Sequence, residues 1–360
     1  MSTQIDAAPD AAAFAAQGQT PRGQELPPEA ALTQMLFGAF VSQALSVAAE
    51  LGVADLLAEQ PQPVAALAAA TSTHERSLYR VLRTLASVGV FRETGEKVFE
   101  LTPLAEPLRS DAPNSVRNGA IFMGAEWHWR VYGEMLHSVR TGQSAWSRAN
   151  GAEVFDYFAA NPGHGEVFNR AMTDMSASAA AAVTEAYDFA GVDTLVDVAG
   201  GHGYLLAAVL RANPGARGVL FDLPQVIEGA HATLERAGVS GRVKLTSGDF
   251  FASVPEGADA YMMKHIIHDW DDERALLILH NIRRAMRDGG RVLICETVVP
   301  EGNEPHFGKL MDLEMLVSPG GVERTEREYR ELLAQAGLGL KRVIPTRSYL
   351  SVVEAVKAGK

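Results

Sequence analysis

The stretch that decides the fold is Val196-Asp197-Val198-Ala199-Gly200-Gly201-His202-Gly203. Its apolar start predicts a strand over Leu195–Ala199, and its glycines predict a tight turn into a helix over Gly203–Ala212. Glycines also let a ligand approach the backbone closely. The spacing differs from Gly-x-Gly-x-x-Gly, so this is not a dinucleotide-binding fingerprint, and the acidic Asp197 stands on the strand itself. An ordinary strand-to-helix turn remains the alternative.

Short apolar strands alternate with helical runs from Thr194 onward. A strongly amphipathic helix over Arg274–Met286 ends at three turn-forming residues, Asp288-Gly289-Gly290. The further strand-like runs are Gly218–Phe221, Val243–Thr246, Ala260–Met263 and Arg291–Cys295. This alternation predicts an α/β fold with a parallel sheet. Two β-prone runs, Lys341–Ile344 and Tyr349–Val356, predict a terminal hairpin.

The N-terminal part has a different pattern. Apolar residues recur at helical spacing after Pro28, and Gly52 is placed to end this first helix. The runs that follow are helical over Val64–Ala69 and Ser77–Gly89 and β-prone over Val90–Thr94 and Val98–Thr102. Three helices followed by a hairpin are typical of a winged helix. The middle, from about Asn114 to Asp188, reads as helical, with a turn at Asn161-Pro162-Gly163.

Composition excludes several classes of function. The chain has 360 residues and 47% hydrophobic content, enough for two domains with a substantial core. Its net charge of −12 argues against a constitutive nucleic-acid binder. Cys295 is the single cysteine, so no internal disulfide or cysteine-based metal site is expected, and the scattered histidines predict no metal site either.

The sequence predicts no membrane or export segment. No run reaches 18 apolar residues, and the start of the chain lacks the basic and apolar regions of a signal peptide. A single cysteine fits a reducing compartment, so we expect a cytoplasmic protein.

Polar residues follow five successive predicted strands. They are Gly200 with Gly201, then Asp222, Asp249, Lys264 with His265 and His268, and finally Glu296. Ligands of open α/β sheets bind at the carboxyl ends of the strands, and a carboxylate such as Asp222 can accept hydrogen bonds from ribose hydroxyls. Asp222 could instead cap the helix after it. Together the five strand ends predict a site for a nucleoside without a strong phosphate requirement.

Five ordered motifs carry a resemblance to a known family. They are Asp197–Gly203, Phe221-Asp222-Leu223-Pro224, Gly248-Asp249-Phe250, Lys264 through His268-Asp269-Trp270, and Gly320-Gly321-Val322-Glu323-Arg324-Thr325. From about Glu29 to its end, the chain resembles the S-adenosylmethionine-dependent small-molecule O-methyltransferases, which include the caffeate O-methyltransferases. It looks closest to the bacterial branch that modifies aromatic natural products.

The resemblance implies a class I methyltransferase with a Rossmann-like parallel sheet and a helical, winged-helix-like N-terminal dimerisation domain. The implied division is a flexible tail over 1–28, the dimerisation domain over 29–113, a helical linker and acceptor-pocket region over 114–190, and the catalytic domain over 191–360. It also implies a homodimer, an aromatic acceptor, and neither a nucleic-acid nor a membrane partner.

The resemblance also assigns the cofactor-binding residues. Gly200 and Gly201 approach the methionine part of S-adenosylmethionine, Asp222 holds the ribose, Asp249 and Phe250 flank the adenine, and Lys264 completes the pocket. Asp197 and Leu223 belong to the same set. Most relatives have a glycine where this chain has Ala199, so the added methyl group is expected to narrow the turn.

His268 is the predicted general base. The acceptor hydroxyl must lose its proton during attack, and because a phenol has a pKa of about 10 and imidazole about 6.5, full transfer in water costs roughly 5 kcal/mol. The resemblance implies that Glu296 and Glu323 flank His268; a carboxylate on one ring nitrogen leaves the other free to accept. The alternative is a helix-start histidine beside Asp269, which would cap the next helix.

The predicted acceptor-binding residues are Trp127, Met172, Met175, Met311, Asp312 and Met315. Methionines suit flat aromatic ligands, although they are more often ordinary core, and Trp127 could equally pack into a dimer core.

Two other functions stay open from the sequence. One is a winged-helix regulator whose C-terminal domain senses a ligand; however, residues 1–115 hold 7 basic and 13 acidic residues, a poor basis for binding a polyanion. The other keeps the cofactor but methylates nitrogen or carbon, or has changed chemistry.

Overall fold

The computed structural model describes residues 26–359, which divide into two compact units. One unit comprises Glu134–Val154 and the chain from Ser176 onward. The other extends up to Gly133 and includes Phe155–Met175. The tail predicted over residues 1–28 lies outside the described residues except for its last three.

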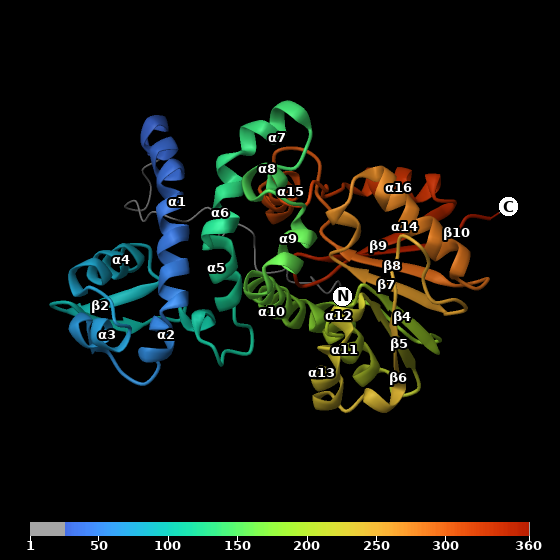
Figure 1. Ribbon diagram of the computed structural model, residues 1–360, viewed down its shortest axis with the longest axis horizontal. Helices are drawn as coiled ribbons and strands as arrows, with labels where there is room; N and C mark the ends of the chain where they lie inside the picture. The colour runs from blue at the N-terminus through green and yellow to red at the C-terminus, as the bar shows by residue number, and fades with distance from the viewer. Residues whose placement is uncertain (1–25, 360) are drawn as a thin grey trace, which may run out of the picture. The chain divides into compact units, whose positions relative to one another are not determined.

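A seven-stranded sheet organises the larger unit, in the order β6-β5-β4-β7-β8-β10-β9 (Figure 1). Its strands are β4 (Thr194–Val198), β5 (Arg217–Asp222), β6 (Val243–Ser247), β7 (Ala260–Lys264), β8 (Arg291–Glu296), β9 (Leu338–Pro345) and β10 (Ser351–Lys357). Strands β6, β5, β4, β7 and β8 are parallel, and β10 pairs antiparallel with β8 and β9. The predicted parallel sheet and terminal hairpin are confirmed.

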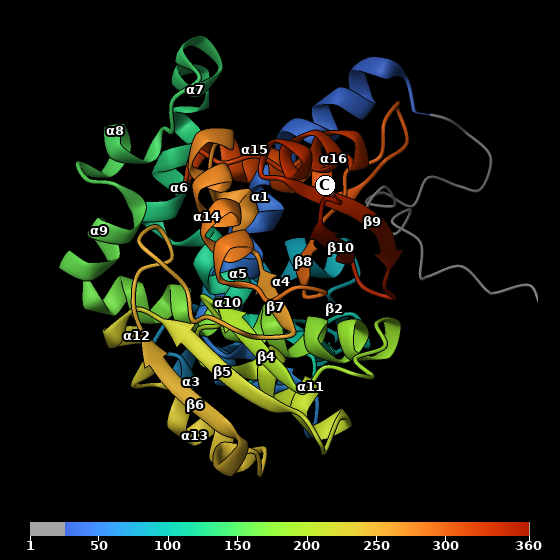
Figure 2. The ribbon, with the colours of Figure 1, turned by 90° about the vertical axis from the view of Figure 1, so that its right-hand side faces the viewer.

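Helices cover both faces of this sheet because strand residues alternate in direction. Val196 and Ile294 pack with α14 and α16, whereas their neighbours Leu195 and Leu293 pack with α11 and α13. Figure 2 shows β4, β5 and β6 side by side. The helices of this unit are α7 (Met135–Thr141), α8 (Trp146–Asn150), α11 (Tyr204–Ala212), α12 (Pro224–Ile227), α13 (Ala230–Arg236), α14 (Asp272–Ala285), α15 (Phe307–Val317) and α16 (Glu326–Gln335).

The smaller unit has its own apolar core. Its elements are α1 (Pro28–Glu50), α2 (Val53–Leu56), β1 (Gln62–Pro63), α3 (Val64–Ala70), α4 (Glu75–Ser87), β2 (Phe91–Gly95), β3 (Val98–Leu101), α5 (Arg117–Gly124) and α6 (Glu126–Gly133). Gly52 follows α1 with a φ of 65°, in the left-handed region that glycine favours, so the predicted helix end is confirmed. Strands β2 and β3 form the predicted hairpin.

One predicted turn is instead a helix start. Helices α9 (Val154–Ala160) and α10 (Pro162–Ala186) are separated by Asn161 alone. The carbonyl of Asn161 accepts the backbone N–H groups of His164 and Gly165, so Pro162 and Gly163 lie in the first turn of α10. Proline is tolerated there because the first N–H groups of a helix have no partner within it.

Helix α1 carries a large exposed apolar face. Its side chains Leu32, Met35, Leu36, Phe37 and Phe40 are between 59% and 76% exposed. Within the described residues, α1 is also the one helix long and apolar enough by composition to cross a membrane, although Thr33, Gln34 and other polar residues interrupt it. A contiguous apolar patch marks an interaction surface. We expect a second copy of the chain to cover it, as the predicted dimerisation domain implies.

The double variant Leu36→Glu/Phe40→Glu is expected to be a monomer, because two buried carboxylates would be left without partners in the dimer. Size-exclusion chromatography with light scattering would then report 38.6 kDa, against twice that mass for the unmodified protein. Leu104→Glu is the matched control, since Leu104 is 61% exposed but lies outside α1. A double variant that stays dimeric would contradict this prediction.

Candidate active site

The carboxyl ends of the parallel strands bring the predicted polar residues to one edge of the sheet. Asp222 ends β5, Lys264 ends β7 and Glu296 ends β8. The glycine-rich turn follows the central strand β4, and Asp249 follows β6. Strands β5 and β7 lie on opposite sides of β4, so the order in which successive strands are added reverses at β4. Ligands of open α/β sheets bind at such a point.

The carboxylate of Asp222 holds the glycine-rich turn. Its Oδ2 accepts the N–H of Gly201 at 2.8 Å, and its Oδ1 accepts the N–H of Leu223 at 2.7 Å. Leu223, not Asp222, is the N-cap residue of α12. The alternative that Asp222 is the N-cap of the helix after it is therefore wrong. Its carboxylate holds the glycine-rich turn instead.

Ala199 is strained within this turn. Its φ is 53°, in the left-handed region where a side chain costs about 1–2 kcal/mol. Gly201 and Gly203 have similar φ values of 58° and 75°. The backbone thus favours glycine at position 199, in line with the glycine expected in relatives. The turn forms nevertheless, with the N–H of Ala199 donating to the carbonyl of Phe221 at 2.7 Å.

Asp197, which is buried, and Lys264, which is half-buried, lie on the same face of the sheet. Asp197 is 2% exposed and its Oδ2 has no hydrogen-bond partner among the described residues. Burial raises the pKa of Asp197 to about 7, against the opposing effect of Lys264. Burial likewise lowers the pKa of Lys264 to about 8. The Lys264 Nζ lies 3.0 Å from Nδ1 of His265. An unpartnered buried carboxylate oxygen indicates a polar ligand.

The remaining residues of the predicted cofactor set are more open. The Oδ1 of Asp249 accepts the N–H of Phe251 at 2.8 Å, which leaves Oδ2 available. Phe250 makes edge-to-face contacts with Phe251 and Trp270. Leu223 is 42% exposed. These residues stand at the ends of β5 and β6, on the side of β4 away from His268.

His268 lies in a 3₁₀ turn, Ile267–Asp269, between β7 and α14, and is 5% exposed. Its Nδ1 lies 2.7 Å from Oε1 of Glu323, and its Nε2 lies 3.5 Å from Oδ1 of Asp269. Burial alone lowers the pKa of His268, but the carboxylates of Asp269 and Glu323 outweigh it and raise the pKa to about 9. The ring is thus held between two acidic groups.

Glu296 contacts the backbone that carries His268. Its Oε1 accepts the N–H groups of Ile266, Ile267 and His268 at 3.0, 2.7 and 3.4 Å, and its Oε2 accepts the hydroxyl of Tyr329. The pair expected to flank the ring was Glu296 with Glu323; in the structure the ring lies between Glu323 and Asp269, and Glu296 contacts the backbone of the loop instead. The reason is strand alternation, which points Glu296 toward α14 and α16, as it does Ile294.

Sequence reasoning missed two features of this site. The alternative interpretation of His268 makes Asp269 a helix cap, whereas in the structure Asp271 caps α14 by accepting the N–H of Arg274 at 2.8 Å. The ring of His265 stacks on His268 with centroids 5.0 Å apart and on Tyr349 with centroids 5.8 Å apart. The adjacency of Asp269 to His268 was the signal available. Nothing in the sequence pairs His265 with Tyr349.

The predicted acceptor-binding residues belong to both units. Trp127 is buried among aromatic rings in the smaller unit and stacks on His164 with centroids 5.1 Å apart. Met172 and Met175 are half-buried in the part of α10 that belongs to that unit. In the larger unit Met315 is buried, and Oδ1 of Asp312 accepts the N–H of Glu323 at 2.9 Å. Met311 precedes Asp312 on α15 and is half-buried.

Comparison with known proteins agrees with this geometry. Residues 132–339 match the family described as the O-methyltransferase domain, and residues 33–111 match the O-methyltransferase dimerisation domain. The chain is 47% identical to a phenazine O-methyltransferase of Lysobacter antibioticus, over 93% of this chain and 98% of that one. The chain belongs to the O-methyltransferase family.

Solved structures extend the comparison. A crystal structure titled LaPhzM matches with a TM-score of 0.88 at 47% identity, over 92% of this chain and 100% of that one. Human N-acetylserotonin methyltransferase in complex with S-adenosylmethionine matches with a TM-score of 0.85 at 28% identity, over 94% of this chain and 99% of that one. The predicted class I methyltransferase fold, enzyme class and dimerisation domain are confirmed.

S-adenosylmethionine is the cofactor of this O-methyltransferase, and the site fits it. The unpartnered Oδ2 of Asp197 offers an acceptor to a polar or cationic group. Gly200 leaves the space that such a group needs, because a Cβ there would lie 2.5 Å from the Asp197 carboxyl group and from a methyl group of Leu220. Neighbouring acidic residues suit a cofactor that carries a positive charge.

The adjacent positions 199 and 200 give a matched pair of variants of the O-methyltransferase. Ala199→Gly relieves the left-handed strain without changing the turn, so the Kd for S-adenosylhomocysteine is expected to change less than about threefold. Gly200→Ala places a methyl group against Asp197 and Leu220, so we expect a loss of about 1–3 kcal/mol in unfolding free energy and at least about tenfold weaker binding. Calorimetric titration measures the Kd of both variants, and urea denaturation measures the unfolding free energy. A tenfold change in the Kd of Ala199→Gly would contradict the stated geometry.

If His268 is the general base, as the sequence predicts, its raised pKa sets the pH dependence of the O-methyltransferase. A base must be deprotonated to act, so kcat/KM is expected to rise with pH up to about 9 and to fall about tenfold per unit below it. Glu323→Gln removes one of the carboxylates that raise this pKa. The rising limb should therefore move to lower pH. An unchanged pH profile of kcat/KM in Glu323→Gln would show that Glu323 does not raise the pKa of His268.

Proposed function

We propose that this protein transfers the methyl group of S-adenosylmethionine to a phenolic hydroxyl of an aromatic or polyketide-type small molecule, with His268 as general base. Relatives support this acceptor class. Besides the phenazine enzyme, they include 2,7-dihydroxy-5-methyl-1-naphthoate 7-O-methyltransferase, 37% identical, and 3-amino-4-hydroxybenzoate 4-O-methyltransferase, 37% identical. The site supports it through the arrangement of His268 with Glu323 and Asp269.

The observation that carries the assignment of His268 is its hydrogen bond to Glu323 at 2.7 Å within a buried site. A carboxylate on Nδ1 selects the tautomer with the proton on that nitrogen and leaves Nε2 to accept a proton. Asp269 lies 3.5 Å from Nε2 and is half-buried, and this burial raises its pKa to about 6. Asp269 therefore stabilises the imidazolium that forms when Nε2 takes the proton.

The charges of the site set the energy of proton transfer. A phenol pKa of about 10 lies about one unit above that of His268, so transfer to the neutral ring costs about 1.4 kcal/mol, instead of roughly 5 kcal/mol for an unperturbed imidazole. The raised pKa also means that free energy is needed to deprotonate His268 before catalysis. When bound, S-adenosylmethionine supplies the methyl group and a positive charge. A nearby positive charge favours the neutral imidazole.

The cofactor-binding assignments form part of the proposal. Gly200 and Gly201 shape the turn, Asp222 holds it and offers its remaining lone pairs to the ribose, and Asp249 has a free carboxylate oxygen beside Phe250. Lys264 and Asp197 supply charged groups at the same edge of the sheet. The acceptor contacts are proposed for Trp127, Met172, Met175, Met311, Asp312 and Met315.

The assignment of domains is also proposed. We place a tail at 1–28, the dimerisation domain at 29–113, a linker and acceptor-pocket region at 114–190, and the catalytic domain at 191–360. The proposed location is the cytoplasm, supported by the single cysteine, Cys295, which is free and buried.

A second chemistry has specific support from relatives. An 8-amino-8-demethylriboflavin N,N-dimethyltransferase is 37% identical to this chain, and an aclacinomycin 10-hydroxylase is 35% identical. A neutral amine attacks through its free lone pair, so the attack itself needs no general base, and the proton leaves the resulting ammonium group afterwards. Retention of turnover in a variant without His268 would therefore favour nitrogen as the acceptor.

His268→Ala is expected to lower turnover on a phenolic acceptor by about 10²–10⁴-fold, the usual contribution of a general base. Binding of S-adenosylhomocysteine should stay within about threefold, because His268 is assigned to the acceptor and not to the cofactor. Acceptors are screened among hydroxyphenazines, hydroxynaphthoates and aminohydroxybenzoates by the mass gain of one methyl group. His231→Ala is a matched control on α13. Equal turnover by the two variants would remove His268 from its role.

A further inference from the structure

One buried carboxylate holds the loop that carries His268 through the backbone N–H groups of that loop. Residues 266–268 each donate a backbone N–H to Oε1 of Glu296, which is fully buried. The hydroxyl of Tyr329, on α16, donates to the other oxygen, Oε2. Tyr329 is fully buried as well. Its hydroxyl thus restrains the carboxylate that anchors three successive peptide groups of the loop.

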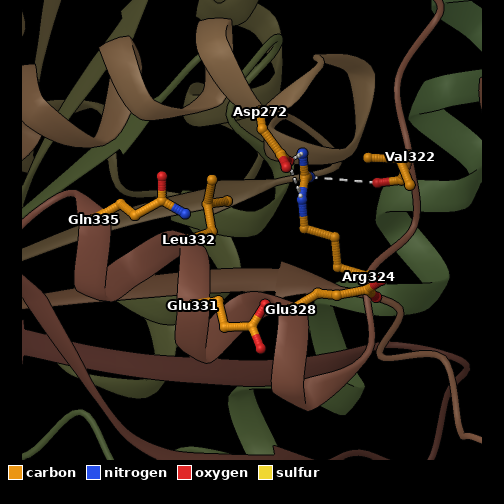
Figure 3. A pocket seen from close by; sticks show the side chains of 7 residues that line it. All are labelled: Asp272, Val322, Arg324, Glu328, Glu331, Leu332 and Gln335. Atoms are coloured by element: carbon orange, nitrogen blue, oxygen red, sulfur yellow. Dashed lines mark hydrogen bonds and ion pairs between the residues drawn. The ribbon is translucent and has the colours of Figure 1, made fainter.

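One buried cation holds the same loop through its backbone carbonyl groups. The guanidinium of Arg324 is 2% exposed; it donates to the carbonyl of Ile267 at 3.2 Å and to that of Trp270 at 3.1 Å. It also donates to Val322 and Asp272, as Figure 3 shows. Arginine suits this task because its planar donors point in fixed directions.

The segment that provides Arg324 also holds the base directly. The N–H of Val322 donates to the carbonyl of His268 at 2.8 Å. Gly321 permits this approach, because a Cβ at that position would collide with the same carbonyl. Glu323 then reaches the imidazole itself. Four successive residues, 321–324, therefore fit the loop from one side, while Glu296 and Tyr329 support it from the sheet and α16.

We propose that Tyr329 and Arg324 are positioning residues for His268, acting through the backbone of residues 266–270. With Glu296 they fix the place from which the imidazole reaches the acceptor hydroxyl. The proposal rests on His268 acting as the base. A buried carboxylate and a buried guanidinium allow little movement, since each is committed to several hydrogen bonds. A displacement of about 1 Å at a reacting group can lower a rate about 10²-fold.

The first test compares two tyrosine variants. Tyr329→Phe removes only the hydroxyl that restrains Glu296. Tyr261→Phe is its matched control, because Tyr261 is also fully buried and its hydroxyl donates to the carbonyl of Pro255 at 2.7 Å, outside the loop. We expect comparable losses in Tm, but a fall in kcat of about tenfold or more for Tyr329→Phe alone. KM for S-adenosylmethionine should stay within about threefold in both.

The second test compares two arginine variants. Arg324→Lys keeps the charge but loses the fork that reaches two loop carbonyls, so kcat should fall about 10²-fold. Arg242→Lys is the control, because Arg242 donates to the carbonyls of Leu210, Asn213 and Ala216 next to β6. If Arg324→Lys does not fold, the tyrosine pair decides the proposal. A fall in kcat no larger than that of the controls overturns it.

A third measurement separates this proposal from the assignment of His268 as base. The imidazole of His268 is followed by NMR of histidine-labelled, cofactor-free protein, with His268→Ala identifying its signal. Tyr329→Phe should shift that signal and its titration, and Tyr261→Phe should leave both in place. If His268→Ala retains turnover, the assigned base is wrong, and the NMR comparison alone then judges the positioning: an unmoved signal overturns it.

Discussion

The carboxylate of Glu296 is the group on which the geometry of the active site depends. It ends β8, where strand alternation directs it to the face covered by α14 and α16. A fully buried carboxylate must be satisfied by donors, and here three come from consecutive backbone N–H groups and one from Tyr329. The loop between β7 and α14 meets that demand in the conformation that places His268 beside Glu323 and Asp269.

The two faces of the sheet divide the chemistry. Asp197 and Lys264 share the orientation of Leu195 and Met262, on the face packed by α11 and α13, whereas Glu296 points to the opposite face. Asp197 and Lys264 are thus separated by the thickness of a strand from the carboxylate that holds the loop of His268. The buried charges of Glu296 and Arg324 each have several hydrogen-bond partners, whereas Oδ2 of the buried Asp197 has none among the described residues.

Several features of the site followed from the sequence because they depend on local order along the chain. The strand–glycine–helix pattern located the turn, and the rule that parallel strands end at one edge located Asp222, Lys264 and Glu296. The left-handed φ of Ala199 was not readable, because alanine gives no local sign of that conformation. The turn assigned to Pro162 was wrong, because proline and glycine fit the first turn of a helix as well as a loop.

By itself, the sequence determined the α/β class, the parallel direction of the central strands and the set of polar residues at the strand ends. These follow from periodicity and motif spacing, which are local properties, and the family was indicated by the resemblance of five motifs. Only the tertiary structure decided which carboxylate holds the ring of His268 and which holds its backbone. Glu296 and Glu323 are the same residue type near the same histidine, and their separate roles arise from side-chain direction on β8 and from the contact of residues 321–324 with the loop.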